Sequence, residues 1–131
     1  LMAVDARSEV DVLMGTGGTP EGVLAACAIK GLGGEMLARM DPQKDSEKKA
    51  LAERGTDLSQ IFTVDSLVKA EDVFFSATGI SGGTFLPGVQ YTGYGATTHS
   101  IVVRGRTGTI RRLESSHSWE KLMRFSAVNY D

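Results

Sequence analysis

A glycine-rich loop that ends in a carboxylate carries the most chemical information in this sequence. The loop reads Gly15-Thr16-Gly17-Gly18-Thr19-Pro20-Glu21-Gly22. Three glycines in four residues let the backbone approach a ligand closely and expose N–H donors toward it, and such donors suit a phosphate. Because the Glu21 carboxylate beside a phosphate would be repelled without a cation between them, the combination predicts a divalent metal ion.

The flanking sequence predicts that this loop joins a strand to a helix. Residues 10–15 form a short, largely apolar run that is typical of a buried parallel strand, and residues 20–32 are rich in good helix formers. Thr19 stands where an N-cap belongs and Pro20 stands at N1, which places Glu21 at N2. Gly33 follows the helix in the position where helices commonly end in a left-handed glycine.

Glu21 also has a simpler interpretation that needs no ligand. An acid in the first turn complements the helix dipole by about 0.3–1 kcal/mol, so position alone does not distinguish the two interpretations. The density of glycines favours a ligand. The loop lacks the lysine of the GxxxxGK[ST] motif, which disfavours nucleotide hydrolysis, and a GxGxxG pattern would need glycine where Pro20 stands.

Composition limits the classes of protein to consider. The 131 residues, 41% of them apolar, form one domain or part of one, and a net charge of −2 argues against nucleic-acid binding. The single cysteine, Cys27, makes no intrachain disulfide and is expected as a small buried apolar residue. Without a signal sequence or a long apolar stretch, we expect a cytoplasmic protein with no membrane partner. Residues 1–7 resemble the tail of a helix, which predicts a piece of a longer polypeptide.

The remaining sequence predicts a mixed α+β organisation with an antiparallel tail. The segment 35–40 is compatible with either strand or helix, and residues 44–54 predict an exposed, charged helix. A brief helix is expected from Asp65, capped by Asp65 or Thr63. Strands are predicted at 60–63, 73–79 (as a central strand), 89–91, 96–104 and 108–115, with a hairpin turn at 106–108 and a last helix at 119–123.

Other polar residues receive structural interpretations. His99 adjoins the apolar face of its strand, so a hydrogen-bonded structural role is favoured over metal binding or acid–base catalysis, and His117 is expected to cap the last helix or to meet solvent. Asp11 and Asp72 border apolar strands and are expected at turns or edges. A local basic stripe consists of four arginines: Arg104, Arg106, Arg111 and Arg112. For most of them, a position on a solvated strand face is a better explanation than an anion-binding site.

Three blocks of residues carry a resemblance that spans nearly the whole chain. They are Asp11-Val-Leu-Met-Gly-Thr-Gly-Gly-Thr-Pro-Glu-Gly-Val23, Val73-Phe-Phe-Ser-Ala-Thr-Gly79, and Thr97-Thr-His-Ser-Ile-Val102 followed by Gly108-Thr-Ile-Arg-Arg112. In this order they resemble the C-terminal part of the GlpX-type, class II fructose-1,6-bisphosphatases of bacteria. The resemblance implies that residues 1–131 are the C-terminal portion of a layered αβαβα sugar-phosphatase fold, similar to inositol monophosphatases and fructose bisphosphatases.

The resemblance also implies roles for residues of the loop. Glu21 matches a metal ligand, for Mg²⁺ or Mn²⁺, and Gly18 matches a glycine that contacts the sugar phosphate; Gly17 and Thr19 are expected to bind the substrate beside it. The family's catalytic residues and other ligands lie in an N-terminal part that this sequence lacks, so no catalytic residue is expected here. We therefore expect fructose 1,6-bisphosphate and that N-terminal part as partners, a homo-oligomer, and no activity from this chain alone.

Three alternatives remain open from the sequence. The same loop suits a related substrate, such as sedoheptulose 1,7-bisphosphate or an inositol phosphate. A non-catalytic subunit that binds a phosphosugar belongs to another class and would retain ligand binding without releasing phosphate. Nucleotide binding through the glycine loop is the least favoured, because the lysine noted above is absent.

Overall fold

A four-stranded antiparallel sheet forms the centre of the structure, a computed structural model that describes residues 1–5 and 8–126. Strand β5 (Gly95–Arg104) pairs along its whole length with β6 (Thr109–Ser118). Its other edge pairs with β3 (Phe74–Thr78) and with β4 (Gln90–Tyr91). The prediction of β3 as a central strand is therefore wrong, because within the described residues β3 pairs with β5 alone and β5 takes the central place.

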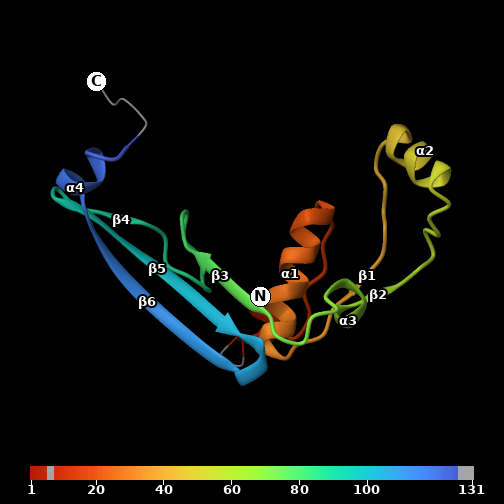
Figure 1. Cartoon of the computed structure of the whole chain (residues 1–131), viewed down its shortest axis with the longest axis horizontal. Coiled ribbons are helices and arrows are strands. Elements are labelled where there is room, and N and C mark those ends of the chain that lie inside the picture. The colour runs from red at the N-terminus through yellow and green to blue at the C-terminus, as the bar shows by residue number, and fades with distance from the viewer. Residues whose placement is uncertain (6–7, 127–131) are drawn as a thin grey trace.

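The β5–β6 hairpin confirms the predicted antiparallel tail. The two strands are joined by the 3₁₀ turn η2 (Gly105–Thr107) and by Gly108, whose φ of 61° lies in the left-handed region that favours glycine. Strand β6 continues to Ser118, beyond the predicted end at 115, and helix α4 (Trp119–Met123) follows at its predicted position. Figure 1 shows this hairpin extending away from helix α1, with α4 at its far end.

Helix α1 (Thr19–Leu32) packs against β3 and β5. Ile101 and Val103, which alternate with more polar residues along β5, are fully buried. A Cβ on Gly31 would meet Val103 Cγ1 at 3.1 Å, so the glycine lets the helix backbone lie close to the strand. Cys27, which was predicted to be buried, is half-buried and packs beside a small apolar cluster that consists of Ala26, Val68 and Val73.

Glycine residues cap helix α1 at both ends, and the predicted N-cap Thr19 is instead the first helical residue. Gly18, in an extended conformation, is the N-cap, so Glu21 lies at the third helical position and not at N2 as predicted from Thr19. The Gly18 carbonyl accepts the first helical hydrogen bond from Gly22 N–H at 2.9 Å, and Pro20 is tolerated because it still lies in the first turn. The predicted left-handed cap at Gly33 is confirmed, with a φ of 76°.

The predicted strand at residues 10–15 is not formed. Val12, Leu13 and Met14 are 73%, 64% and 90% exposed, and no strand of the described residues pairs with this segment. The apolar run satisfies a local criterion for a strand, but a strand also needs a neighbouring backbone for its hydrogen bonds and apolar cover for its side chains. Neither is supplied by the part of the chain that is described.

Short elements complete the fold on the opposite side of α1 from the hairpin (Figure 1). Strand β1 (Leu37–Ala38) pairs with β2 (Phe62–Thr63), which resolves the ambiguous segment 35–40 as a strand. Helix α2 (Asp45–Glu53) has no buried residue, as predicted. Helix α3 (Val64–Leu67) is capped by Thr63, and near the chain start Met2–Val4 form the 3₁₀ turn η1.

An ion pair links the start of β3 to the end of β5. Arg104 donates to Asp72 at 2.8 Å and lies over the Phe74 ring at 5.1 Å from its centroid. The hydrogen bond from Arg104 holds the pKa of the Asp72 carboxyl below its usual range, against the opposing effect of burial. Arg106, Arg111 and Arg112 are exposed, so a solvated face does explain most of the basic stripe, with Arg104 the exception.

We expect Asp72→Asn to lower the melting temperature of the whole protein at pH 7. A carboxyl whose folded pKa is depressed stabilises the fold above its unfolded pKa, and this contribution is lost as the pH falls through the folded value, below about pH 4. The variant should therefore lose less stability than the parent on acidification from pH 5 to pH 3. Thermal unfolding across this range measures it, with the exposed Glu53→Gln as control. Parallel curves for parent and Asp72→Asn would contradict the role of the pair.

Candidate functional site

Gly18 and Glu21, two of the predicted site residues, meet at the start of α1. The Glu21 side chain turns back over Gly18, so that a Cβ built on residue 18 would collide with Glu21 Oε2 and lie 3.1 Å from Cδ. Gly18 has a φ of −66° and a ψ of 152°, an extended backbone that any residue adopts. A side chain at residue 18 would therefore push aside the end of the flexible Glu21 side chain, while the backbone conformation itself does not call for glycine.

The neighbouring predicted residues present exposed backbone to the same region. Gly17 and Thr19 are exposed, and a Cβ on Gly17 would meet no atom within 4 Å. Because the first helical hydrogen bond starts at Gly22 N–H, the Thr19 and Glu21 N–H groups precede the intrahelical ladder. This end of α1 combines open donors, the positive end of the helix dipole and one carboxylate.

The described residues do not make a complete metal centre around Glu21. No group of three or more His, Cys, Asp or Glu side chains that could hold an ion is found within residues 1–5 and 8–126. A divalent cation takes six or more oxygen ligands, some of them water, so Glu21 fits as one ligand among several. Its exposed carboxylate, next to open N–H groups, leaves room for ligands from outside these residues.

The histidines lie in cross-strand pairs of the hairpin. His99 Nε2 is 3.3 Å from Glu114 Oε2, and these two residues face each other in the β5–β6 register. His117 Nε2 is 2.8 Å from Thr98 Oγ1. Strand β6 is longer than predicted and includes His117, so this residue does not cap the last helix; it is half-buried and meets solvent in part. The hairpin turn predicted at 106–108 sets the register that joins His99 to Glu114, a pair that the sequence interpretation missed.

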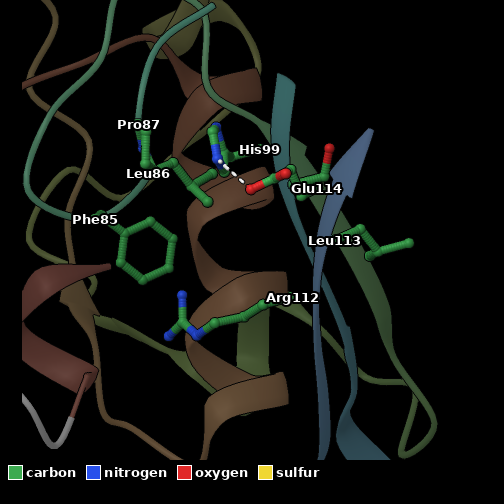
Figure 2. A pocket seen from close by; sticks show the side chains of 8 residues that line it. Phe85, Leu86, Pro87, His99, Arg112, Leu113 and Glu114 are labelled. Atoms are coloured by element: carbon green, nitrogen blue, oxygen red, sulfur yellow. Dashed lines mark ion pairs between the residues drawn. The ribbon is translucent and has the colours of Figure 1, made fainter. Parts of the chain in front are cut away.

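A cavity of about 330 Å³ lies next to the His99–Glu114 pair. Figure 2 shows Phe85, Leu86 and Pro87 on one side of it, and His99, Glu114 and Arg112 on the other, with Leu113 pointing away. Its apolar wall comes from the loop between β3 and β4, and its charged groups come from the hairpin. None of its lining residues belongs to the glycine loop at 15–22.

The sequence model of the bacterial, glpX-encoded fructose-1,6-bisphosphatases matches residues 1–117. This chain belongs to that family. The chain is 38% identical over 128 aligned residues to the class 2 fructose-1,6-bisphosphatase of Haemophilus influenzae. This alignment covers 88% of this chain and 38% of the relative. It is 39% identical over 123 residues to fructose-1,6-bisphosphatase 1 class 2 of Escherichia coli K12, with 84% and 37% covered.

Membership of the glpX-encoded bisphosphatase family confirms the resemblance drawn from the three sequence blocks, and the mixed α/β architecture agrees with the predicted fold class. The chain spans less than two fifths of the length of these curated relatives. Within the described part of this bisphosphatase family member, no helix has the length and apolar character needed to cross a bilayer.

We expect Gly18→Ala to displace the Glu21 carboxylate without straining the backbone. The new Cβ would occupy the space of Glu21 Oε2, while the extended conformation at residue 18 suits alanine. Crystal structures of Gly18→Ala and of the matched control Gly17→Ala, both in the whole protein, measure the position of the carboxylate. Gly17→Ala should leave it in place, because open space surrounds that position. An unmoved Glu21 in Gly18→Ala would contradict the steric relation between these residues.

Proposed function

We propose that this chain is part of an enzyme that hydrolyses the 1-phosphate of fructose 1,6-bisphosphate, giving fructose 6-phosphate and inorganic phosphate. The observation that carries the proposal is the Glu21 carboxylate folded over Gly18 beside the open N–H groups at the start of α1. Membership of the glpX-encoded bisphosphatase family and the names of the two relatives support the substrate.

In this proposal the loop binds the phosphate and Glu21 holds a cation. Backbone N–H groups around Gly17, Gly18 and Thr19 would donate to phosphate oxygens, assisted by the helix dipole. The Glu21 carboxylate would provide one oxygen ligand for Mg²⁺ or Mn²⁺. Such an ion, when bound, lowers the pKa of a water molecule and offsets charge on phosphate oxygens.

The reaction is a transfer of the phosphoryl group to water. A bond forms between the water oxygen and phosphorus, and the bond between phosphorus and the O1 oxygen of the sugar breaks. One proton of the water ends on O1, which leaves as the sugar hydroxyl. The role of the N–H groups is to stabilise the negative charge on the equatorial phosphate oxygens during this exchange, and to hold the group in line.

The rest of the site would come from a further part of the whole protein. One carboxylate is too few for the proposed ion, and the apolar run at Val12–Met14 leads into the loop uncovered by the described residues. Both features support a partner surface that packs on this run and brings the remaining ligands and the catalytic groups. The chain by itself is therefore proposed to be inactive.

We expect Glu21→Gln in the whole protein to lower kcat for fructose 1,6-bisphosphate by about 100-fold or more. The amide keeps the shape of the side chain but removes the negative charge that holds the cation. Phosphate release at saturating metal measures turnover, and an unchanged melting temperature shows that the fold is retained.

The matched control for this change is Glu53→Gln, at the exposed end of α2. It removes the same charge far from the loop in sequence and should leave kcat unchanged. Near-normal turnover in Glu21→Gln would refute the metal role of this residue.

We expect EDTA to abolish phosphate release from the whole protein, and Mn²⁺ or Mg²⁺ added in excess to restore it. The same assay with fructose 1,6-bisphosphate, sedoheptulose 1,7-bisphosphate and an inositol monophosphate identifies the preferred substrate by kcat/KM. Full activity in EDTA would exclude the divalent ion. Binding of all three compounds without release of phosphate from any would instead indicate a non-catalytic phosphosugar-binding protein.

A further inference from the structure

Strand β6 presents a backbone edge of 10 residues that no neighbouring strand covers within the described part of the chain. It pairs there with β5 alone, and Figure 1 shows it on the outer side of the hairpin. Its register with β5 runs unbroken from Thr109 to Ser118, so no bulge interrupts the edge, and the strand contains neither proline nor lysine. Proteins protect open edges with such features, because unpaired N–H and C=O groups attract another strand. The edge of β6 is therefore suited to pairing.

The hydrogen bonds of β5 show which backbone groups of β6 point outward. The His99 carbonyl accepts from Gly79 N–H at 3.0 Å, so the backbone of His99 points toward β3 and away from β6. Glu114, which faces His99 in the register, therefore belongs to a non-hydrogen-bonded pair and points its own N–H and C=O away from β5. Alternation along the strand gives the same outward direction to three further residues: Ile110, Arg112 and Ser116.

This edge can pair with the same edge of a second copy around a two-fold axis. In an antiparallel pair of this kind each outward-pointing residue must meet another outward-pointing residue, so the axis lies between two copies of a single residue. An axis at Leu113 or at Glu114 lies near the middle of β6 and uses almost its whole length. An axis nearer either end would leave more of the edge unpaired.

The charges of β6 distinguish these two registers. An axis at Glu114 places its carboxylate opposite the identical carboxylate of the second copy, which is destabilising. An axis at Leu113 instead places Arg112 opposite Glu114 of the second copy, on both sides of the axis. The side chains of Glu114 and Arg112 are 71% and 41% exposed, so both keep surface for a neighbour beside their contacts with His99 and Asp5. The axis at Leu113 is therefore favoured.

Leu113 supplies an apolar contact at this axis. It is 43% exposed, and Figure 2 shows its side chain pointing away from the cavity. Because its backbone points toward β5, two copies of Leu113 would form a non-hydrogen-bonded pair with Cα atoms about 4.5 Å apart, the closer of the two antiparallel spacings. Two exposed leucine side chains would then cover each other and remove apolar surface from water.

We propose that two copies of this chain join edge to edge through β6, in a register centred on Leu113, so that their sheets form one continuous sheet. The outward-pointing backbone groups of β6 exchange hydrogen bonds with the second copy, and the opposed charges fix the register. A second copy is favoured over a different partner because the edge is complementary to itself. The surface uses no residue of the glycine loop, so it stands independently of the proposed hydrolysis.

A cysteine at position 113 tests the register in the whole protein. Leu113→Cys should form a disulfide between subunits under mild oxidation, because a Cα separation of about 4.5 Å falls within the range of about 4.4–6.8 Å that a disulfide needs. Electrophoresis without reductant measures the cross-linked fraction, and the parent protein shows the background from its native cysteines.

The matched control for this cross-link is Arg111→Cys, on the same face of β6. In the proposed register residue 111 faces residue 115 of the second copy, so two copies of residue 111 lie about 13 Å apart, too far for a disulfide. Arg111→Cys alone should therefore form no cross-link. Co-expression of Arg111→Cys with Ser115→Cys should restore one between the two variants.

Sedimentation of a charged variant measures the contribution of the apolar contact. Leu113→Asp should halve the number of subunits in the whole protein, because two carboxylates would meet at the axis. The matched control is Ile80→Asp, at a 71% exposed position in the loop between β3 and β4, which should leave the number of subunits unchanged. Unchanged circular dichroism shows that the fold is retained.

Three results would overturn the proposal: a monomeric parent protein, no cross-link in Leu113→Cys, or equal cross-linking of Leu113→Cys and Arg111→Cys. A monomer in which Leu113→Cys resists a thiol reagent would show that another segment of the same polypeptide covers β6. If Leu113→Asp does not fold, Glu114→Arg decides: alone it should weaken assembly by about tenfold or more, and adding Arg112→Glu should restore it. Each failure leaves the proposed hydrolysis intact, because that is judged by turnover in Glu21→Gln.

Discussion

The close approach of helix α1 to strand β5 is the constraint on which the rest of the structure depends. At Gly31 the absence of a side chain lets the helix backbone lie against Val103, and both Val103 and Ile101 are fully buried beneath it. Strand β5 is in turn held on both edges, by β6 along one side and by β3 and β4 along the other. A helix fixed at its C-terminal end by this contact projects its first turn, with Gly18 and Glu21, away from the turn that ends β5.

Local signals in the sequence predicted the elements that need no distant partner. The left-handed glycine after α1, the Thr63 cap of α3 and the glycine that closes the β5–β6 turn each act within a few residues, and all are confirmed. Two features that depend on distant partners were not predicted correctly. The run at residues 10–15 has the composition of a strand but no neighbour, and β3 was placed at the centre of a sheet because its residues favour strands, although pairing places it beside β5.

In the candidate site, too, local sequence predicted some features, while others depend on contacts between distant residues. Gly18 and Glu21 are three residues apart at a helix start, so their meeting follows from helical geometry once the helix is known. The sequence did not predict their exact positions in the first turn. Thr19 and Gly18 are both favourable N-cap residues, and in the structure the N-cap is Gly18. The His99–Glu114 pair depends on the register of a hairpin, where an error of one residue would turn each side chain to the other face.

The uncovered segment from Val12 to Met14 has a consequence for preorganisation. It enters the glycine-rich loop at residues 15–22 directly, so the loop is anchored through α1 on its C-terminal side and by no strand of the described residues on its N-terminal side. Immobilising a residue costs about 1–2 kcal/mol in conformational entropy, and a surface that buried this apolar run would offset that cost before any substrate arrived. Under the proposed function, completing the site and making its anion-binding loop rigid would then occur in a single coupled step.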